Sequence, residues 1–189
     1  WRPRRKNTDR KLFSAIARAF LQRSSEDFLL EDDGARWLGE SEKMLALAMR
    51  RSGTRSLVRV EAPSVKGGAR TSVIRTCMRD HAFIVDSIQL ALAQLGVEVL
   101  DRVNMVLAVH RDNSGQLIRV GGEAGQSESL LWLEVSPVDK VEDRKAIERA
   151  LKDRLEEVRL AVGDFRRMLR RMKDLANQFE FVASVQRDR

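Results

Sequence analysis

Hydrophobic residues in the first part of the chain recur every three or four positions, which is the spacing of one face of an α-helix. A first helix is predicted to begin near Thr8 or Asp9, with an apolar face of Leu12, Phe13, Ile16, Phe20 and Leu21. A second helix is expected over residues 35–51, because Gly53 is a natural helix stop. Residues 1–53 are therefore interpreted as a helical arm.

From Arg55 the hydrophobic period changes to two, the alternation typical of β-strands. Strands are expected at residues 56–62, 71–79, 97–112, 116–120 and 129–135. The composition of residues 62–70 predicts a loop, and the sequence DNSG at 112–115 predicts a hairpin turn. A helix over residues 82–95, closed by Gly96, separates the second strand from the third.

The last predicted element is a helix that Asp139 caps and that continues as far as Phe179. The order strand, helix, strand, strand, helix predicts an α+β fold, with a mostly antiparallel sheet and helices on one face. We divide the chain into the helical arm of 1–53, an α+β domain of 54–180 that ends in the long helix, and a tail of 181–189.

Apolar residues of this last helix keep a 4-3-4 spacing from Leu151 to Phe179. At 1.5 Å per residue this stretch spans roughly 42 Å, which is longer than one sheet face needs. We expect an assembly surface, facing another subunit or the rest of the polypeptide, at Leu169, Met172, Ala176 and Phe179. The alternative is that Gly163 bends the helix back onto its own domain.

The net charge of +7 invites a nucleic-acid interpretation, but 35 basic residues are mixed with 28 acidic ones. Aromatic residues make up 5% of the chain and Tyr is absent, which leaves few platforms for stacking bases. Nucleic-acid binding is therefore not favoured. The sequence contains no run of about 18 apolar residues, so we expect no membrane span. The single cysteine, Cys77, fits a reducing cytoplasm.

Residues with catalytic or metal-binding chemistry form no recognisable set. His81 and His110 have no second ligand at metal-binding spacing, and Cys77 lies in a strand-like run typical of a small buried hydrophobe. The glycines of 121–125 match no phosphate-binding motif. We predict no catalytic, cofactor-binding or metal-binding residue in this chain.

The junction between the second strand and the helix at 82–95 is the strongest binding candidate. A helix N-terminus exposes unpaired N–H groups and a partial positive charge, which suit a carboxylate such as that of an amino acid. Asp80 is expected to cap the helix and Asp86 to lie in its first turn. We therefore place a candidate amino-acid effector site at Asp80, His81, Ala82, Phe83 and Asp86.

The same stretch, RDHAFIVDSIQLALAQLGVEV, resembles a segment of the large bacterial NAD-specific glutamate dehydrogenases. In that family a strand is followed by the motif acidic-x-Pro-Phe-(Leu/Ile)-Val-Asp-Ser, in which x is any residue. Phe83 to Ser87 match in order, and Ala82 stands in place of the proline. Similar motifs follow in consistent order from Leu12 to Leu169, carried by LFSAIARAFLQRSSEDF, LAVHRDNSGQLIRV and SESLLWLEV.

This resemblance implies an N-terminal, ACT-like (ferredoxin-like) regulatory region of a cytoplasmic enzyme that converts L-glutamate to 2-oxoglutarate and ammonia with NAD. The catalytic residues and the NAD site would lie elsewhere in the polypeptide, so the chain alone is expected to be inactive. Its partners would be the remainder of the polypeptide, further copies in a homo-oligomer, and an amino-acid effector. Two alternatives stay open: a stand-alone basic module that binds RNA, and a structural adaptor without a ligand.

Overall fold

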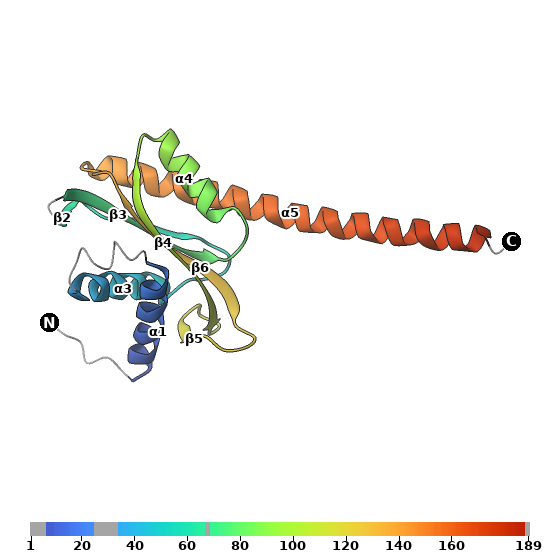
Figure 1. Ribbon diagram of the computed structural model, residues 1–189, viewed down its shortest axis with the longest axis horizontal. Coiled ribbons are helices and arrows are strands. Elements are labelled where there is room, and N and C mark those ends of the chain that lie inside the picture. Colours follow the sequence, from blue (N-terminus) through green and yellow to red (C-terminus); the bar gives the residue numbers. More distant parts are fainter. Residues whose placement is uncertain (1–6, 25–33, 67–68, 188–189) are drawn as a thin grey trace.

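The computed structural model describes residues 7–24, 34–66 and 69–187 (Figure 1). Its helices are α1 (Asn7–Arg23), α3 (Gly34–Ala48), α4 (Ile84–Gln94) and α5 (Val141–Arg187). Its strands are β1 (Leu57–Val60), β2 (Ser64–Lys66), β3 (Ala69–Arg79), β4 (Val99–Arg111), β5 (Leu117–Val120) and β6 (Gln126–Val135).

The strands form one sheet in the order β1-β3-β6-β4-β5, with β2 paired to β3 off this path. All of the pairings are antiparallel. The central strand is β6, which pairs with β3 on one side and β4 on the other. The predicted α+β fold with a mostly antiparallel sheet is confirmed. The prediction of a loop over 62–70 is wrong at 64–66, a short strand, and at 69–70, the start of β3 with which that strand pairs.

Helices cover both faces of this sheet (Figure 1). The helices α4 and α5 lie on one face, where the buried cluster includes Ile88, Leu131, Leu133 and Leu151. The N-terminal helices, expected as an arm that precedes the domain, lie on the other face. There Phe20 of α1 packs edge-on against Trp132 of β6, with ring centroids 5.7 Å apart. The boundary at residues 53 and 54 stays a prediction, although residues on both sides of it share this core.

A buried ion-pair cluster joins the N-terminal helical layer to the sheet. The carboxylate of Glu128 in β6 is fully buried and accepts hydrogen bonds from Arg51, just after α3, and Arg111, at the end of β4. The shortest nitrogen–oxygen distance is 2.7 Å for each arginine. Burial by itself would raise the pKa of Glu128, but the hydrogen bonds and charges of the two guanidinium groups outweigh it and lower that pKa.

The backbone beside this cluster makes a close contact that requires glycine. The N–H of Arg51 donates to the carbonyl oxygen of Gly115 at 3.0 Å, so the segment after α3 pairs with the β4–β5 hairpin. Gly115 has a φ of +83°, and a Cβ at this position would lie 2.3 Å from the carbonyl oxygen of Arg51. The hairpin glycine therefore sets how closely the two segments approach.

We expect Gly115→Ala to lower the free energy of unfolding by about 3 kcal/mol, because alanine would be strained at this φ and its Cβ would overlap the Arg51 carbonyl. Gly121→Ala is the matched control. Gly121 has a φ of +85° but no heavy atom within 4 Å of the added Cβ, so only the backbone cost of about 1 kcal/mol applies. Urea unfolding of both variants measures the difference, and equal losses would contradict the steric role.

The ion pairs of Glu128 should make stability depend on pH. Its pKa is lower in the folded chain than the ordinary value of 4.5, so the added stability is complete above that value and is lost as the pH falls through the folded pKa. Glu128→Gln should cost about 3–5 kcal/mol at neutral pH, because the buried Arg51 and the half-buried Arg111 both lose a charged partner. It should also flatten the loss of stability on acidification, measured by denaturant unfolding across the pH range.

The control for this experiment is Glu156→Gln. Glu156 lies on the solvent-exposed side of α5, next to the buried Leu155. A hydrogen bond from Arg159 lowers the pKa of Glu156 as well. Because the Glu156 side chain is 50% exposed, this variant should change stability by no more than about 0.5 kcal/mol. A Glu128→Gln variant that behaves like this control would show that the buried cluster contributes nothing to stability.

Candidate regulatory site

The turn between β3 and α4 carries the residues predicted to bind an effector. The N–H of Asp80 donates to the carbonyl oxygen of Ser127 in β6 at 2.9 Å. The Ser127 hydroxyl lies 3.5 Å from the Asp80 carboxylate and donates to it. Asp80 is thus tied to the neighbouring strand. The prediction that Asp80 caps the helix is wrong, since the N-cap residue is Phe83.

Phe83 adopts a backbone conformation that is unusual for its residue type. Its φ of 69° and ψ of 10° lie in the left-handed region, which costs an L-residue roughly 1–2 kcal/mol. The helix begins at Ile84 and not at Ala82 as predicted, and Phe83 provides no side-chain cap. The first N–H groups of an α-helix have no partner within the helix. Those of α4 can therefore donate hydrogen bonds to an external carboxylate.

The remaining predicted effector residues lie around this helix start. The Nδ1 of His81 is 3.2 Å from the carbonyl oxygen of Ala82, and the Nε2 of His81 is buried without a hydrogen-bond partner among the described residues. Asp86 is exposed in the first turn of α4. The Phe83 side chain is 66% exposed. The role of these five residues as an effector site stays a prediction.

An apolar groove of about 580 Å³ lies between this turn and α5. Ala82 and Phe83 form one wall of the groove, and the other wall comprises Ala161, Val162, Phe165 and Leu169. The structure therefore brings part of the predicted effector turn together with Leu169 of the predicted assembly surface. The heptad spacing includes Val162 and Phe165, but no feature of the sequence relates them to Phe83.

The chemistry available here is that of binding. The partial positive charge of the α4 N-terminus favours a carboxylate, and the adjacent groove favours an apolar group on the same molecule. No group of three or more His, Cys, Asp or Glu residues in the described part of the chain could hold a metal ion. Burial, and then the charge of Glu128, raises the pKa of the Cys77 thiol to about 12, so this thiol is not ionised at neutral pH.

The second wall of the groove belongs to a helix that is longer than predicted. The helix α5 runs without interruption from Val141 to Arg187, so it neither bends at Gly163 nor ends at Phe179, and it includes 181–187 of the predicted tail. Figure 1 shows its C-terminal half projecting beyond the sheet. Within the described residues, no helix is both long enough and apolar enough to cross a membrane.

Burial decreases along α5 in the direction of its C-terminus. Leu151 and Leu155 are fully buried. Beyond them, the large apolar side chains that are exposed are Leu160, Phe165, Met168, Leu169, Met172 and Leu175. Ala176 is exposed as well, and the side chain of Phe179 lies outside the described side chains. The predicted assembly surface is thus exposed to solvent at Leu169, Met172 and Ala176.

Comparison with known proteins identifies the family. Residues 16–151 match the model of the family described as "Glutamate dehydrogenase, ACT1 domain". The chain belongs to this family. The match runs from within α1 to Leu151 of α5, so it includes the whole sheet and the N-terminal helical layer. The resemblance to the glutamate dehydrogenases and the expected ACT-like fold are therefore confirmed.

Two curated relatives of this ACT1 domain are NAD-specific glutamate dehydrogenases. The protein of Pseudomonas aeruginosa is 31% identical over 101 residues, which are 51% of this chain and 6% of that protein. The protein of Halomonas elongata is 34% identical over 114 residues, which are 58% of this chain and 7% of that protein. The matched part thus spans less than a tenth of either relative. No solved structure matches the chain.

Proposed function

We propose that this ACT1 domain is a regulatory and assembly region of an NAD-dependent glutamate dehydrogenase, which converts L-glutamate to 2-oxoglutarate and ammonia in the cytoplasm. The observation that carries the proposal is the family match over residues 16–151. NAD and the catalytic residues would belong to the remainder of the polypeptide. The chain by itself would then produce no NADH from glutamate.

The charge distribution favours this proposal over a stand-alone module that binds RNA. RNA affinity depends on basic side chains that are free to contact phosphates. Arg36, Arg51 and Arg111 instead contact the buried carboxylates of Glu134 and Glu128. These three arginines are therefore already neutralised within the fold and are not free to contact phosphates.

An amino acid with an apolar side chain is the effector that the groove suits best. Its carboxylate would bind the first N–H groups of α4, and its side chain would lie between Phe83 and Phe165. Asp86, exposed in the same helical turn, would then face its ammonium group. Such a ligand would contact the two elements that meet at the groove, the β3–α4 turn and α5.

A thermal-shift screen with single amino acids tests this proposal. A ligand at about 100 times its dissociation constant adds roughly 2.7 kcal/mol of stability, which should raise the melting temperature by roughly 5–10 °C. Phe165→Glu should abolish the shift, because it places a charge in the apolar groove. Leu160→Glu is the control: Leu160 is 51% exposed, Phe165 is 55% exposed, and Leu160 does not line the groove.

A flat screen at millimolar concentrations of every amino acid would contradict effector binding. The structural adaptor without a ligand would then be the better proposal. A shift that persists in Phe165→Glu would place the ligand elsewhere on the chain.

The exposed part of α5 is the surface that we propose for assembly. A row of large apolar side chains on a projecting helix is unfavourable in water unless another surface covers it. A second copy of the chain or the rest of the polypeptide would cover it. The anchored half of α5 would remain on its own sheet in either case, because Leu151 and Leu155 are fully buried there.

The double variant Leu169→Glu, Met172→Glu should lower the mass of the assembly that the chain forms in solution and leave the fold of the chain intact. Both side chains are already 40% or more exposed, so the charges would disrupt contacts with a partner and not the core. Light scattering after size exclusion measures the mass, and circular dichroism checks the fold. Ile118→Glu, at a 50% exposed position on β5, is the control. If the wild-type chain is monomeric at high concentration, self-assembly is contradicted. The exposed part of α5 would then dock on the rest of the polypeptide.

A further inference from the structure

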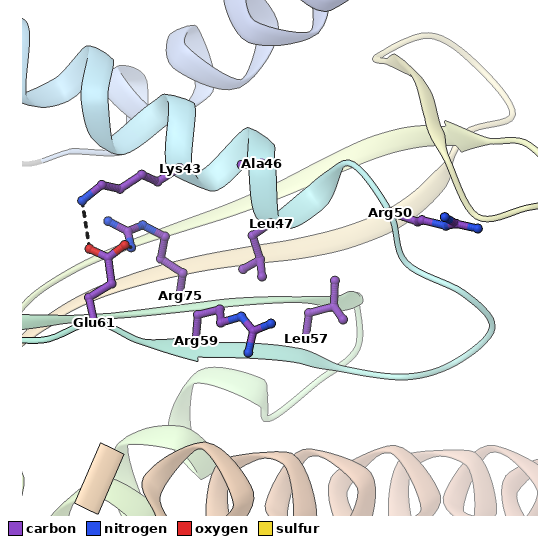
Figure 2. A pocket seen from close by; sticks show the side chains of 8 residues that line it. All are labelled: Lys43, Ala46, Leu47, Arg50, Leu57, Arg59, Glu61 and Arg75. Carbon is purple, nitrogen blue, oxygen red and sulfur yellow. Dashed lines mark hydrogen bonds and ion pairs between the residues drawn. The ribbon is translucent and has the colours of Figure 1, made fainter. Parts of the chain in front are cut away.

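A second hollow, of about 460 Å³, lies between α3 and the edge strand β1. It is on the other side of the sheet from the groove, because α3 packs on the opposite face from α4 and α5. Figure 2 shows the side chains that line it, which are Lys43, Ala46, Leu47, Arg50, Leu57, Arg59, Glu61 and Arg75. Four of these are basic and one is acidic.

At one end of the hollow, Lys43 and Arg75 share the carboxylate of Glu61 (Figure 2) and also that of Glu40. The Lys43 ammonium lies 2.9 Å from Glu61, and the Arg75 guanidinium lies 2.7 Å from the same side chain. Arg75 also pairs with Glu40 of α3. Although Arg75 is only 2% exposed, its Nε has no hydrogen-bond partner among the described residues. Buried donors are rarely left unpaired, so Arg75 keeps one donor that its two carboxylate partners do not use.

The rest of the hollow combines positive charge with apolar surface. Arg59 is 68% exposed and lies 3.6 Å from Glu148 of α5, while Arg50 makes no ion pair with a described residue. Leu47 of α3 and Leu57 of β1 point toward each other between the charged residues (Figure 2). A molecule that fills this space would meet cations near its charged group and two leucines near its middle.

We propose that this hollow binds a small organic anion, in which a carboxylate or a phosphate is attached to an apolar group. The anionic group is held by Lys43 and Arg75 in place of Glu61, and the apolar group lies between Leu47 and Leu57. Guanidinium and ammonium groups form short, strong hydrogen bonds with both kinds of anion. Glu61 competes with the ligand for Lys43 and Arg75. The site is independent of the amino-acid groove, and a flat amino-acid screen leaves it standing.

Calorimetric titration of the whole 189-residue chain tests the proposal with four probes. These are inorganic phosphate, phenyl phosphate, acetate and hexanoate. At least one of the two probes with an apolar group should bind more tightly than its bare ion, and added NaCl should weaken that binding. Preference for phenyl phosphate assigns the site to phosphate esters, and preference for hexanoate assigns it to carboxylates. Failure of all four probes to bind at millimolar concentration overturns the proposal.

Three variants and one control test the assignment to this hollow. Lys43→Gln should weaken binding by about 10-fold, because it removes a charged hydrogen-bond donor, and Arg59→Gln should weaken it less, because it removes only a nearby positive charge. Glu61→Gln should tighten binding severalfold, since it releases Lys43 and Arg75 from a competing carboxylate. Damage to the fold cannot produce this gain. Lys145→Gln, on the exposed side of α5, should have no effect. Weaker binding in Glu61→Gln, or an equal loss in Lys145→Gln, would overturn the assignment.

Discussion

Glu128, a carboxylate without exposed surface, connects three separate parts of the chain. It lies in β6, and its two arginine partners come from the end of β4 and from the segment after α3. Buried ion pairs add little net stability compared with a well-packed apolar cluster, but losing one partner leaves an uncompensated charge in the interior. The cluster therefore acts mainly as a constraint on geometry. It sets where the chain leaves α3, and the Arg51–Gly115 hydrogen bond then fixes that segment against the β4–β5 hairpin.

The covered second face of the sheet is the part of the fold that the sequence alone could not predict. The strands and helices themselves follow from hydrophobic periods of two and of three to four, and their order was sufficient for the α+β fold. Arg75, Glu128 and Glu134, however, are charged residues within β3 and β6, and charged residues along a strand ordinarily indicate a solvated face. All three are buried beneath the N-terminal helices. Glu40 and Arg36, the partners of Arg75 and Glu134, lie 35 and 98 residues away in sequence, so no local pattern relates them.

Only the part of the candidate site that consists of consecutive residues could be predicted from the sequence. Residues 80–86 follow one another in the chain, so a strand end and a helix start predict that they lie together. The left-handed conformation of Phe83 and the α5 wall of the groove both result from tertiary packing. The length of α5 was underestimated because the apolar spacing stops at Phe179, whereas the helix, which needs no buried face to continue, extends to Arg187.

A ligand bound in the groove would act on α5 at the point where the helix begins to project. Leu151 and Leu155 anchor the first part of α5 in the core, and exposure increases from Leu160 onward. The groove, at 161–169, therefore lies where the anchored part gives way to the free part. About 27 Å of helix follows Leu169 at 1.5 Å per residue, so a small tilt at the groove is amplified at the far end. A ligand between Phe83 and Phe165 would bias the direction of α5 without disturbing the sheet, because the ion-pair cluster of Glu128 lies on the opposite face.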